Sequence, residues 1–586
     1  MGDDVVGDEL YTYDDVHARG LGGLLDHLRN GGTEDNPPLF YVFAWLSAKL
    51  GDDTVWIRLP SLVAGTAAVP AVYLLGSRTL GRAAGLVAAA IVALSPFAVF
   101  YATEARAYAL LVLLVALSTL LLLEALETGR RAWWAAYAVA ACAVLYTHYT
   151  GALAVAAQTI WALWLYRDRW REIVAATAVA VIGYLPWIPT ELGRPALIAL
   201  APVGPFTAGS ARGSVLHFVP GHPFRDVATV PGTWVVVALA VLLAAALIAL
   251  LAGRERRPTP GLALLLLLVA VPAAGLAAYS ALRTNIFLSR NLACALPAVA
   301  VLIGGTLTSL GGRRGAAAGA LAVALVGVGT VRTMGEEVRG SSGPEVGRYV
   351  EANVTPDDSI ASISFLDSGG PVARGASIYF ERSRENFYPT GPDQDQAWRR
   401  AATRGGRVFL IFQGSVFGHP RRAGPGECFR RQASRDFAET TVSVYALSER
   451  DWACAVEALF PGGIGYEGFS VAEQGEDTAW RWSTRPRATI SVASASDEAR
   501  AMTVSGRLGT GQEHAHDATL RIDDGPPERI RATPEGEPFT RRVVVPARGA
   551  VRMELSTTTD SVSPPGDPRT LYLRVYDLEA RPAGGT

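Results

Sequence analysis

At 586 residues the chain is too long for one ordinary domain, and half of its residues are hydrophobic, with a formal net charge of −1. The charge balance, and the lack of any Lys/Arg cluster interleaved with aromatic residues, argue against a nucleic-acid partner. Hydrophobic residues are unevenly placed, because long apolar runs fill residues 55–332 whereas residues 333–586 have soluble composition. The sequence therefore predicts a membrane part followed by a soluble part.

The first segment, residues 1–54, is acidic. Asp8 and Glu9 are adjacent carboxylates, and an isolated pair of this kind is usually a solvated surface. Here an apolar segment too short to span a membrane begins at Pro37-Pro38, and it predicts a helix lying in the membrane interface. That helix would hold the acidic loop against the membrane, and Lys49 near its end would either snorkel to headgroups or bind a phosphate.

Ten apolar runs follow, and a spanning helix needs roughly 20 such residues. Runs such as Leu262 to Val271 have no polar face, which favours a membrane bundle over a soluble helical core. The predicted spans are 55–77, 83–101, 107–126, 132–147, 150–166, 172–192, 232–252, 260–282, 292–311 and 315–332.

Arginine placement predicts the orientation of the spans. One alternate set of loops is short and basic, which is typical of the cytoplasmic side; it contains Arg78, Arg82, Arg130, Arg131, Arg167, Arg169, Arg171, Arg254, Arg256, Arg257, Arg313 and Arg314. The other set holds the N-terminal segment, three short loops, residues 193–231 and the whole C-terminal part, and is expected to be extracytoplasmic. We therefore expect a plasma-membrane, multi-pass protein with an extracytoplasmic C-terminal half.

The N-terminal segment needs something to carry it outside, yet no apolar stretch precedes it. We therefore expect an earlier membrane helix, absent from the sequence as it stands, which would give eleven spans and a cytoplasmic N-terminus.

The outer loops hold the unusual residues. Glu104 and Arg106 lie close to hydrocarbon, where charges are expensive unless used; they form either a structural pair or, through Arg106, a substrate contact. His148 either caps two helices or lines a polar cavity. Arg290 enters the next span, and it either anchors that helix or binds a phosphate.

These motifs also resemble a known family. In order, GDELYTY, NPPLFY, WIRLPSLVAG, LSPFAVFYATEARAYAL, LYTHYTG and FLSRNLACALP resemble the protein O-mannosyltransferase and aminoarabinose-transferase group of GT-C glycosyltransferases. The resemblance covers roughly residues 7–332 and is closest to bacterial dolichyl-phosphate-mannose-protein mannosyltransferase-like membrane proteins. The departure from the family pattern is the missing first helix.

The resemblance implies an inverting transfer of a sugar from a polyprenyl-phosphate donor to a hydroxyl of an extracytoplasmic glycan, lipid or protein. It implies that Asp8 is the general base and that Glu9 positions Asp8 or the sugar. Glu104 and Arg106 match the second loop motif of the family, and Arg290 matches an arginine near the donor phosphate. A divalent cation is left open, because Asp8, Glu9 and Asp15 could bind one or act without it.

The sequence of the soluble part predicts two domains with different folds. Residues 333–455 alternate helix-like and strand-like segments, which indicates an α/β domain, whereas residues 456–586 hold short alternating runs typical of a β-sandwich. Trp480 and Trp482 either pack the sandwich core or stack on a sugar. Cys428 and Cys454 either pair, if this part is extracytoplasmic, or stay free.

Two other functions compete with the enzyme. A transporter or flippase of lipid-linked glycans would favour internal repeats and broken helices at the midplane, and no repeat is evident. A non-catalytic membrane scaffold carrying a glycan-binding sandwich would leave the loop carboxylates dispensable.

Overall fold

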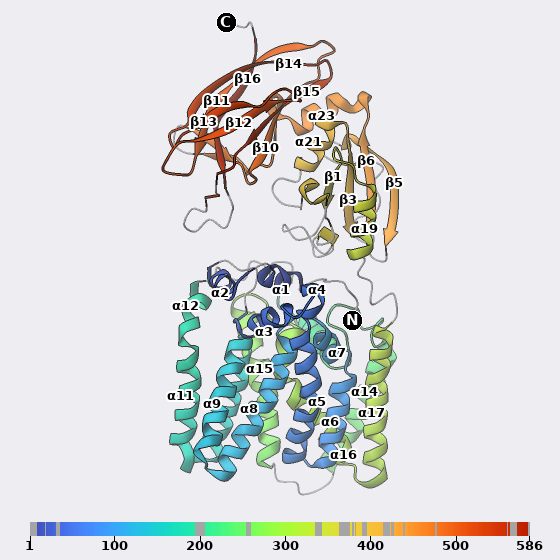
Figure 1. Ribbon diagram of the computed structural model, residues 1–586. Helices are drawn as coiled ribbons and strands as arrows, with labels where there is room; N and C mark the ends of the chain where they lie inside the picture. Colours follow the sequence, from blue (N-terminus) through green and yellow to red (C-terminus); the bar gives the residue numbers. More distant parts are fainter. Residues whose placement is uncertain are drawn as a thin grey trace. The chain divides into compact units, whose positions relative to one another are not determined.

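The computed structural model describes residues 9–17, 19–30, 36–193, 205–252, 259–334, 343–362, 376–377, 380, 382–388, 395–413, 422–423, 427–437, 440–474, 478–559, 561–562 and 571–583. The chain forms two compact units, Met1–Gly340 and Ser341–Thr586. The first is a helical bundle and the second is rich in sheet, as the composition predicted (Figure 1).

Seven helical segments in the described residues are long and apolar enough to cross a membrane, so the chain is a multi-pass membrane protein. The main helices of these segments are α5 (Leu59–Thr79), α8 (Tyr108–Thr128), α11 (Trp170–Tyr184), α14 (Thr233–Ala252), α15 (Pro260–Leu282), α16 (Leu296–Thr308) and α17 (Gly312–Thr333). They run along one bundle, and the predicted polytopic α fold is confirmed (Figure 1).

The three remaining predicted spans differ from simple crossing helices. Residues 83–101 form two helices, α6 (Arg82–Leu94) and α7 (Pro96–Thr103), bent by 57°. The bend falls at Ser95, because Pro96 lacks an amide hydrogen and the Ser95 hydroxyl caps α7 by accepting from Ala98 N at 3.3 Å. α9 (Arg131–Thr147) and α10 (Gly151–Leu165) have 17 and 15 residues, whereas the seven full segments have 18 to 27.

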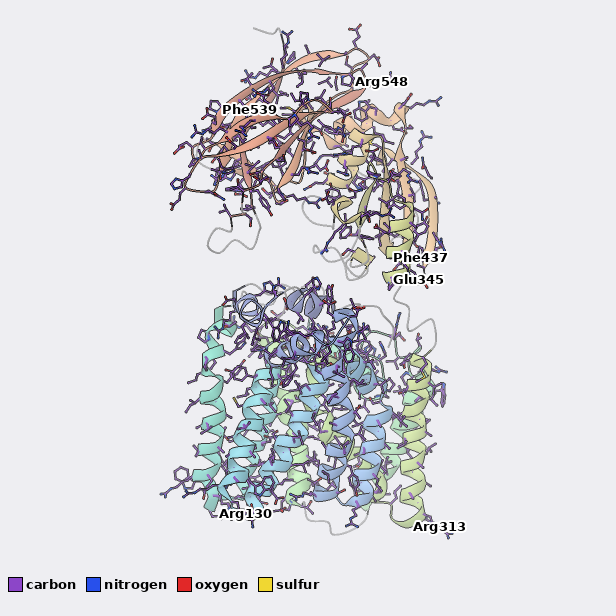
Figure 2. The ribbon with its side chains drawn as sticks, viewed as in Figure 1. Arg130, Arg313, Glu345, Phe437, Phe539 and Arg548 are labelled. Carbon is purple, nitrogen blue, oxygen red and sulfur yellow. A yellow bond between two sulfur atoms is a disulfide. The ribbon has the colours of Figure 1, made fainter. Side chains whose placement is uncertain are left out.

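Short helices cover one end of the bundle: α1 (Glu9–Val16), α2 (Leu21–Asn30), α3 (Leu39–Ala48) and α4 (Asp53–Trp56) (Figure 1). α3 begins directly after Pro38, where the double proline predicted a start. Arg130 and Arg313 both lie at the opposite end of the bundle, on different sides of it (Figure 2). The acidic segment and these basic loops therefore occupy opposite ends, as the arginine pattern predicted.

Small residues let α7 approach α5 closely. A Cβ added at Gly65 of α5 would lie 2.4 Å from the Cβ of Ala102 in α7, so only glycine fits there. This contact fixes α7, and α7 leads directly into the loop that contains Glu104 and Arg106.

The second unit begins with a mixed α/β layer. Its six-stranded sheet has the order β2-β1-β3-β6-β5-β4, in which β1 is parallel to β2 and β3, and β6 is antiparallel to β3. The strands are β1 (Ser359–Ser362), β2 (Phe387–Tyr388), β3 (Arg407–Gln413), β4 (Arg422–Ala423), β5 (Phe429–Phe437) and β6 (Thr440–Leu447); the helices are α19 (Gly343–Asn353), α21 (Asp395–Arg404) and α23 (Trp452–Leu459).

Two five-stranded sheets follow, in the orders β13-β12-β15-β10-β7 and β14-β11-β16-β9-β8. Their alternating apolar side chains form one core that includes Ile490, Val504 and Met553. The strands are β7 (Ile464–Glu467), β8 (Glu473–Gln474), β9 (Ala479–Trp482), β10 (Arg487–Ser494), β11 (Arg500–Thr510), β12 (His516–Ile522), β13 (Glu528–Ala532), β14 (Glu537–Val545), β15 (Gly549–Ser556) and β16 (Leu573–Pro582).

The two tryptophans of β9 are held by the protein itself. Trp482 is 4% exposed, and the guanidinium carbon of Arg574 lies 3.9 Å from its ring centroid. Trp480 is half-buried, and its indole Nε1 donates to Glu473 at 3.0 Å. These contacts favour packing over sugar stacking.

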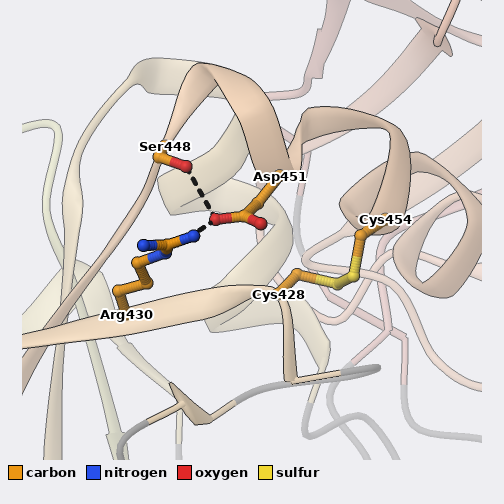
Figure 3. Close-up of a disulfide and its surroundings, with 5 residues drawn as sticks. All are labelled: Cys428, Arg430, Ser448, Asp451 and Cys454. Atoms are coloured by element: carbon orange, nitrogen blue, oxygen red, sulfur yellow. Dashed lines mark hydrogen bonds and ion pairs between the residues drawn. A yellow bond between two sulfur atoms is a disulfide. The ribbon is translucent and has the colours of Figure 1, made fainter.

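Cys428 and Cys454 form a disulfide that joins the start of β5 to α23 (Figure 3). Beside it, Asp451 accepts from Arg430 Nε at 3.1 Å and from the Ser448 hydroxyl at 2.7 Å. The pairing is one of the two alternatives that the sequence left open.

Replacing both disulfide cysteines with serine is expected to lower the free energy of unfolding by about 2–4 kcal/mol, because the bond closes a 26-residue loop. Thermal unfolding of the purified full-length protein without reductant measures this. Cys142→Ser, which removes a free thiol, should melt like the wild type. Equal melting of the disulfide variant and the wild type would contradict the prediction.

Candidate functional site

The acidic helix α1 is fastened to the bundle by one buried carboxylate. Glu9 accepts hydrogen bonds from Arg58 Nε at 2.7 Å and from Arg58 Nη2 at 2.6 Å, and both side chains are at most 5% exposed. Its Oε1 also accepts from the backbone N–H of Ala105 at 2.6 Å. A two-point guanidinium–carboxylate pair of this kind fixes orientation as well as distance.

Thr12 completes the attachment from the next turn of α1. Its hydroxyl donates to the carbonyl oxygen of Ala105 at 2.8 Å, so Glu9 and Thr12 together bind both backbone groups of one residue. Residues three apart share a face of a helix, which is why the pair can meet the same peptide. The loop of Glu104 and Arg106 is thus tied to the N-terminal segment.

Further polar contacts hold the rest of the segment. His27 Nε2 lies 2.9 Å from the buried Asp15 Oδ1, and His17 Nδ1 lies 2.5 Å from Asp53 Oδ2. The Trp45 indole of α3 donates to the carbonyl oxygen of Arg19 at 2.8 Å. Trp45 therefore ties α3 to the turn between α1 and α2.

Asp8 lies outside the described residues. It directly precedes Glu9, whose position is fixed by Arg58 and Ala105. The contacts of Glu9 fix the start of α1, and its role toward Asp8 or the sugar stays a prediction.

A second cluster surrounds His148, in the loop between α9 and α10. Its Nδ1 accepts from the backbone N–H of Thr150 at 3.2 Å and lies 2.9 Å from the Thr150 hydroxyl, so in the neutral ring the proton resides on Nε2. Burial, and then the nearby charges of Arg106 and Arg290, lower the pKa of His148 to about 3. The ring is therefore a neutral group beside two guanidiniums.

This electrostatic link places Arg106, His148 and Arg290 in one neighbourhood, although they come from three separate loops. Arg106 is 6% exposed, and Arg290 is half-buried at the start of the 3₁₀ helix η4 (Ser289–Ala295). Glu104 is buried in the same loop as Arg106. Four of the predicted site residues thus lie at the end of the bundle that the short helices α1 to α4 cover.

An apolar cavity of about 210 Å³ lies next to this cluster. Tyr101 and Tyr108 line it, with ring centroids 4.4 Å apart, and the Tyr108 ring centroid is 5.3 Å from that of His148. Leu296, which directly follows η4, lines another part of it. Tyr108 therefore connects the cavity to His148, and the cavity continues between the membrane helices.

Lys49 takes a different position. It is exposed at the end of α3, and its Nζ lies 4.2 Å from the centroid of the Trp45 ring. A cation stacked on an indole fits the predicted role of an anchor in the membrane interface. No described contact joins Lys49 to the His148 cluster.

The sequence analysis missed Arg58 and Thr12, whose hydrogen bonds attach α1 to the bundle. Arg58 directly precedes Leu59, the first residue of the apolar helix α5, and a buried arginine is costly there without a partner. An arginine at that position therefore could have indicated a buried acidic partner. Thr12 gave none, because its partner is the backbone of a residue 93 positions away.

Comparison with known proteins locates the resemblance. Residues 35–190 match the family model of dolichyl-phosphate-mannose-protein mannosyltransferases. The predicted resemblance to the GT-C glycosyltransferases is confirmed. The matched stretch holds Arg58, Glu104, Arg106 and His148.

One curated relative and two solved structures illustrate the likeness. The chain is 35% identical over 102 residues to YkcB of Bacillus subtilis (strain 168), a candidate mannosyltransferase by its description; the alignment spans 17% of this chain and 14% of that protein. ArnT from Cupriavidus metallidurans, solved bound to undecaprenyl phosphate, is 14% identical with a TM-score of 0.45, over 75% of this chain and 94% of that one. Arabinofuranosyltransferase AftD from Mycobacteria is 13% identical with a TM-score of 0.44, over 100% of this chain and 59% of that one.

Glu9→Ala is expected to release α1, because removing one partner of a buried ion pair costs about 3–5 kcal/mol. Hydrogen exchange should become faster in residues 9–17 and 104–106, which mass spectrometry of the full-length protein detects. Glu124→Ala breaks the half-exposed pair with Arg78 and should leave both segments unchanged. Unchanged exchange in Glu9→Ala would contradict the clamp.

His148 predicts a dependence of stability on pH. Its folded pKa of about 3 is below the ordinary value of 6.5, so between these values the unfolded ring binds a proton and the folded ring does not. Stability is therefore full above pH 6.5 and falls by up to about 1.4 kcal/mol for each pH unit below it.

Thermal unfolding of the full-length protein at pH 7.5 and 5.5 measures this loss. His148→Gln should lose less stability than the wild type between the two values. His514→Gln, which replaces an exposed histidine, should follow the wild type. A wild-type loss in His148→Gln would show that His148 is not the group responsible.

Proposed function

We propose that this protein is a membrane glycosyltransferase that moves a sugar from a polyprenyl-phosphate donor to a hydroxyl of an extracytoplasmic acceptor. The observation that carries the proposal is the convergence of Arg106 and Arg290 on His148 beside an apolar cavity. A lipid phosphate needs both parts, because guanidiniums bind the phosphate oxygens and an apolar space accepts the hydrocarbon.

The family match supports the same donor class. The model that matches residues 35–190 describes enzymes that use dolichyl-phosphate-mannose, in which a sugar is joined to a lipid through phosphate. The C-terminal unit is extracytoplasmic in this proposal. Its disulfide supports that side, because such bonds persist in oxidising compartments.

In the proposed reaction, the acceptor oxygen attacks the anomeric carbon while the bond from that carbon to the phosphate oxygen breaks. The acceptor proton passes to the carboxylate of Asp8, and the electron pair of the broken bond leaves with the lipid phosphate. Arg106 and Arg290 stabilise the negative charge on that phosphate. A single displacement of this kind inverts the anomeric configuration.

Glu9 supplies the positioning in this scheme. Because Arg58 and Ala105 hold its carboxylate from two sides, Glu9 itself is restrained at the same end of the bundle as the arginines. A positioned base typically contributes about 10²–10⁴-fold to the rate. Neutral His148 adds no positive charge beside the phosphate and can donate a hydrogen bond from Nε2.

Asp8→Asn is expected to lower the transfer rate by about 10²-fold or more, since the amide cannot accept the proton. The assay follows transfer of radiolabelled sugar from polyprenyl phosphate in membranes that contain the full-length protein. Asp26→Asn, which changes an exposed carboxylate on α2, should transfer at the wild-type rate. Wild-type activity in Asp8→Asn would remove Asp8 from the mechanism.

A further inference from the structure

A large cleft lies within the C-terminal unit, where the α/β layer meets the first sheet of the sandwich. Its volume is about 920 Å³, in the range of pockets that bind small molecules. Six arginines line it: Arg384, Arg400, Arg404, Arg485, Arg487 and Arg529. Four carboxylates line it as well, so the cleft has an excess of positive charge.

Hydrogen bonds across the junction hold the two walls together. The Gln396 side chain of α21 donates to Phe469 O at 3.1 Å and accepts from Gly468 N at 2.8 Å. Arg399 donates to the carbonyl oxygens of Leu459 and Tyr466 at 2.7 and 3.0 Å. The cleft is thus formed before any ligand arrives, which lowers the ordering cost of binding.

Two of the arginines, Arg400 and Arg485, are held in place by hydrogen bonds to neighbouring residues. Arg400 Nη1 donates to Glu467 at 2.7 Å, and the same Glu467 oxygen accepts from the Tyr388 hydroxyl at 2.8 Å. Arg485 donates to the carbonyl oxygens of Glu385 and Phe387 at 2.7 and 3.0 Å, so its charge meets only neutral groups there.

Arg404, like Arg400, has a buried guanidinium nitrogen, Nε, without a hydrogen-bond partner in the part of the chain that the structure describes. Burial, and next the charge of Arg400, hold the pKa of Arg404 below its ordinary value of 12.5. Such a guanidinium is destabilised until an anion neutralises it. The exposed Arg384 also lines the cleft near the same wall.

The remaining lining indicates the kind of anion. Hydroxyl groups from three neighbouring strands and the loop after β15 line the cleft beside the arginines: Thr489, Thr519, Ser556, Thr557 and Thr558. A hydroxyl both donates and accepts, which suits the hydroxyl groups of a sugar. Tyr388 is the one aromatic residue in the lining, and it is buried beneath Arg485, so nucleic-acid bases find no exposed ring to stack on.

We infer that this cleft binds an anionic glycan, with Arg404 and Arg384 contacting its carboxylate or phosphate oxygens and the threonine and serine hydroxyls contacting its sugar rings. The inference goes beyond the proposed transfer reaction. Binding at the cleft requires no catalysis, so a failure here and a failure of the transferase assay are separate outcomes.

Isothermal titration calorimetry on the full-length protein in nanodiscs tests the inference with three probes. Trigalacturonate carries carboxylates on a sugar chain, maltotriose is its neutral counterpart, and inorganic phosphate is an anion without sugar. We expect trigalacturonate to bind, maltotriose to bind at least tenfold more weakly, and phosphate to compete only weakly. Raising NaCl from 0.05 to 0.5 M should weaken trigalacturonate binding through screening.

Arg404→Gln should weaken trigalacturonate binding by about tenfold or more, as the loss of a charge-assisted hydrogen bond predicts. Arg500→Gln, an exposed arginine on the other sheet, should bind within twofold of the wild type. Arg384→Gln is a second variant in case Arg404→Gln does not fold, and it should also weaken binding. Absence of binding, equal binding of maltotriose, equally strong binding of phosphate alone, or wild-type affinity in both cleft variants would each overturn the inference.

Discussion

The ion pair between Glu9 and Arg58 is the interaction on which the candidate site depends. It is buried, it has two-point geometry, and it shares its carboxylate with the amide of Ala105. One side chain therefore connects the N-terminal segment, the start of α5 and the loop of Glu104 and Arg106. Moving two charges out of water costs free energy. Removing only one partner would cost more, because the other charge would stay buried without compensation.

The other charges at this end of the bundle are also poorly exposed to solvent. Arg106 and Arg290 lie near a buried, neutral imidazole and beside an apolar cavity, and this environment weakens solvent screening. An anion that enters would meet two guanidiniums at reduced dielectric. The bend at Ser95 contributes, because it separates α6 from α7, which carries Tyr101 to the cavity and leads to Glu104.

Several parts of the fold were predictable because they rest on local pattern. Apolar length identified the membrane helices, the double proline marked the start of α3, and alternation identified strands β10 to β12 and β14 to β16. The break within residues 83–101 was missed, because the apolar run continues through Pro96 without interruption. The role of Arg58 was missed as well, since its partner is 49 residues away.

By itself, the sequence determined the membrane and soluble parts and the basic and acidic ends of the bundle. It also showed the resemblance of roughly residues 7–332 to a glycosyltransferase family, whose model matches residues 35–190. These follow from composition and from short motifs, which need no knowledge of contacts. Only the tertiary structure decided that Glu9 is a clamp, that Arg106 and Arg290 meet at His148 while Lys49 stands apart, and that six arginines share one cleft. The reason is that pairing between distant side chains depends on packing, and packing leaves no mark in the local sequence.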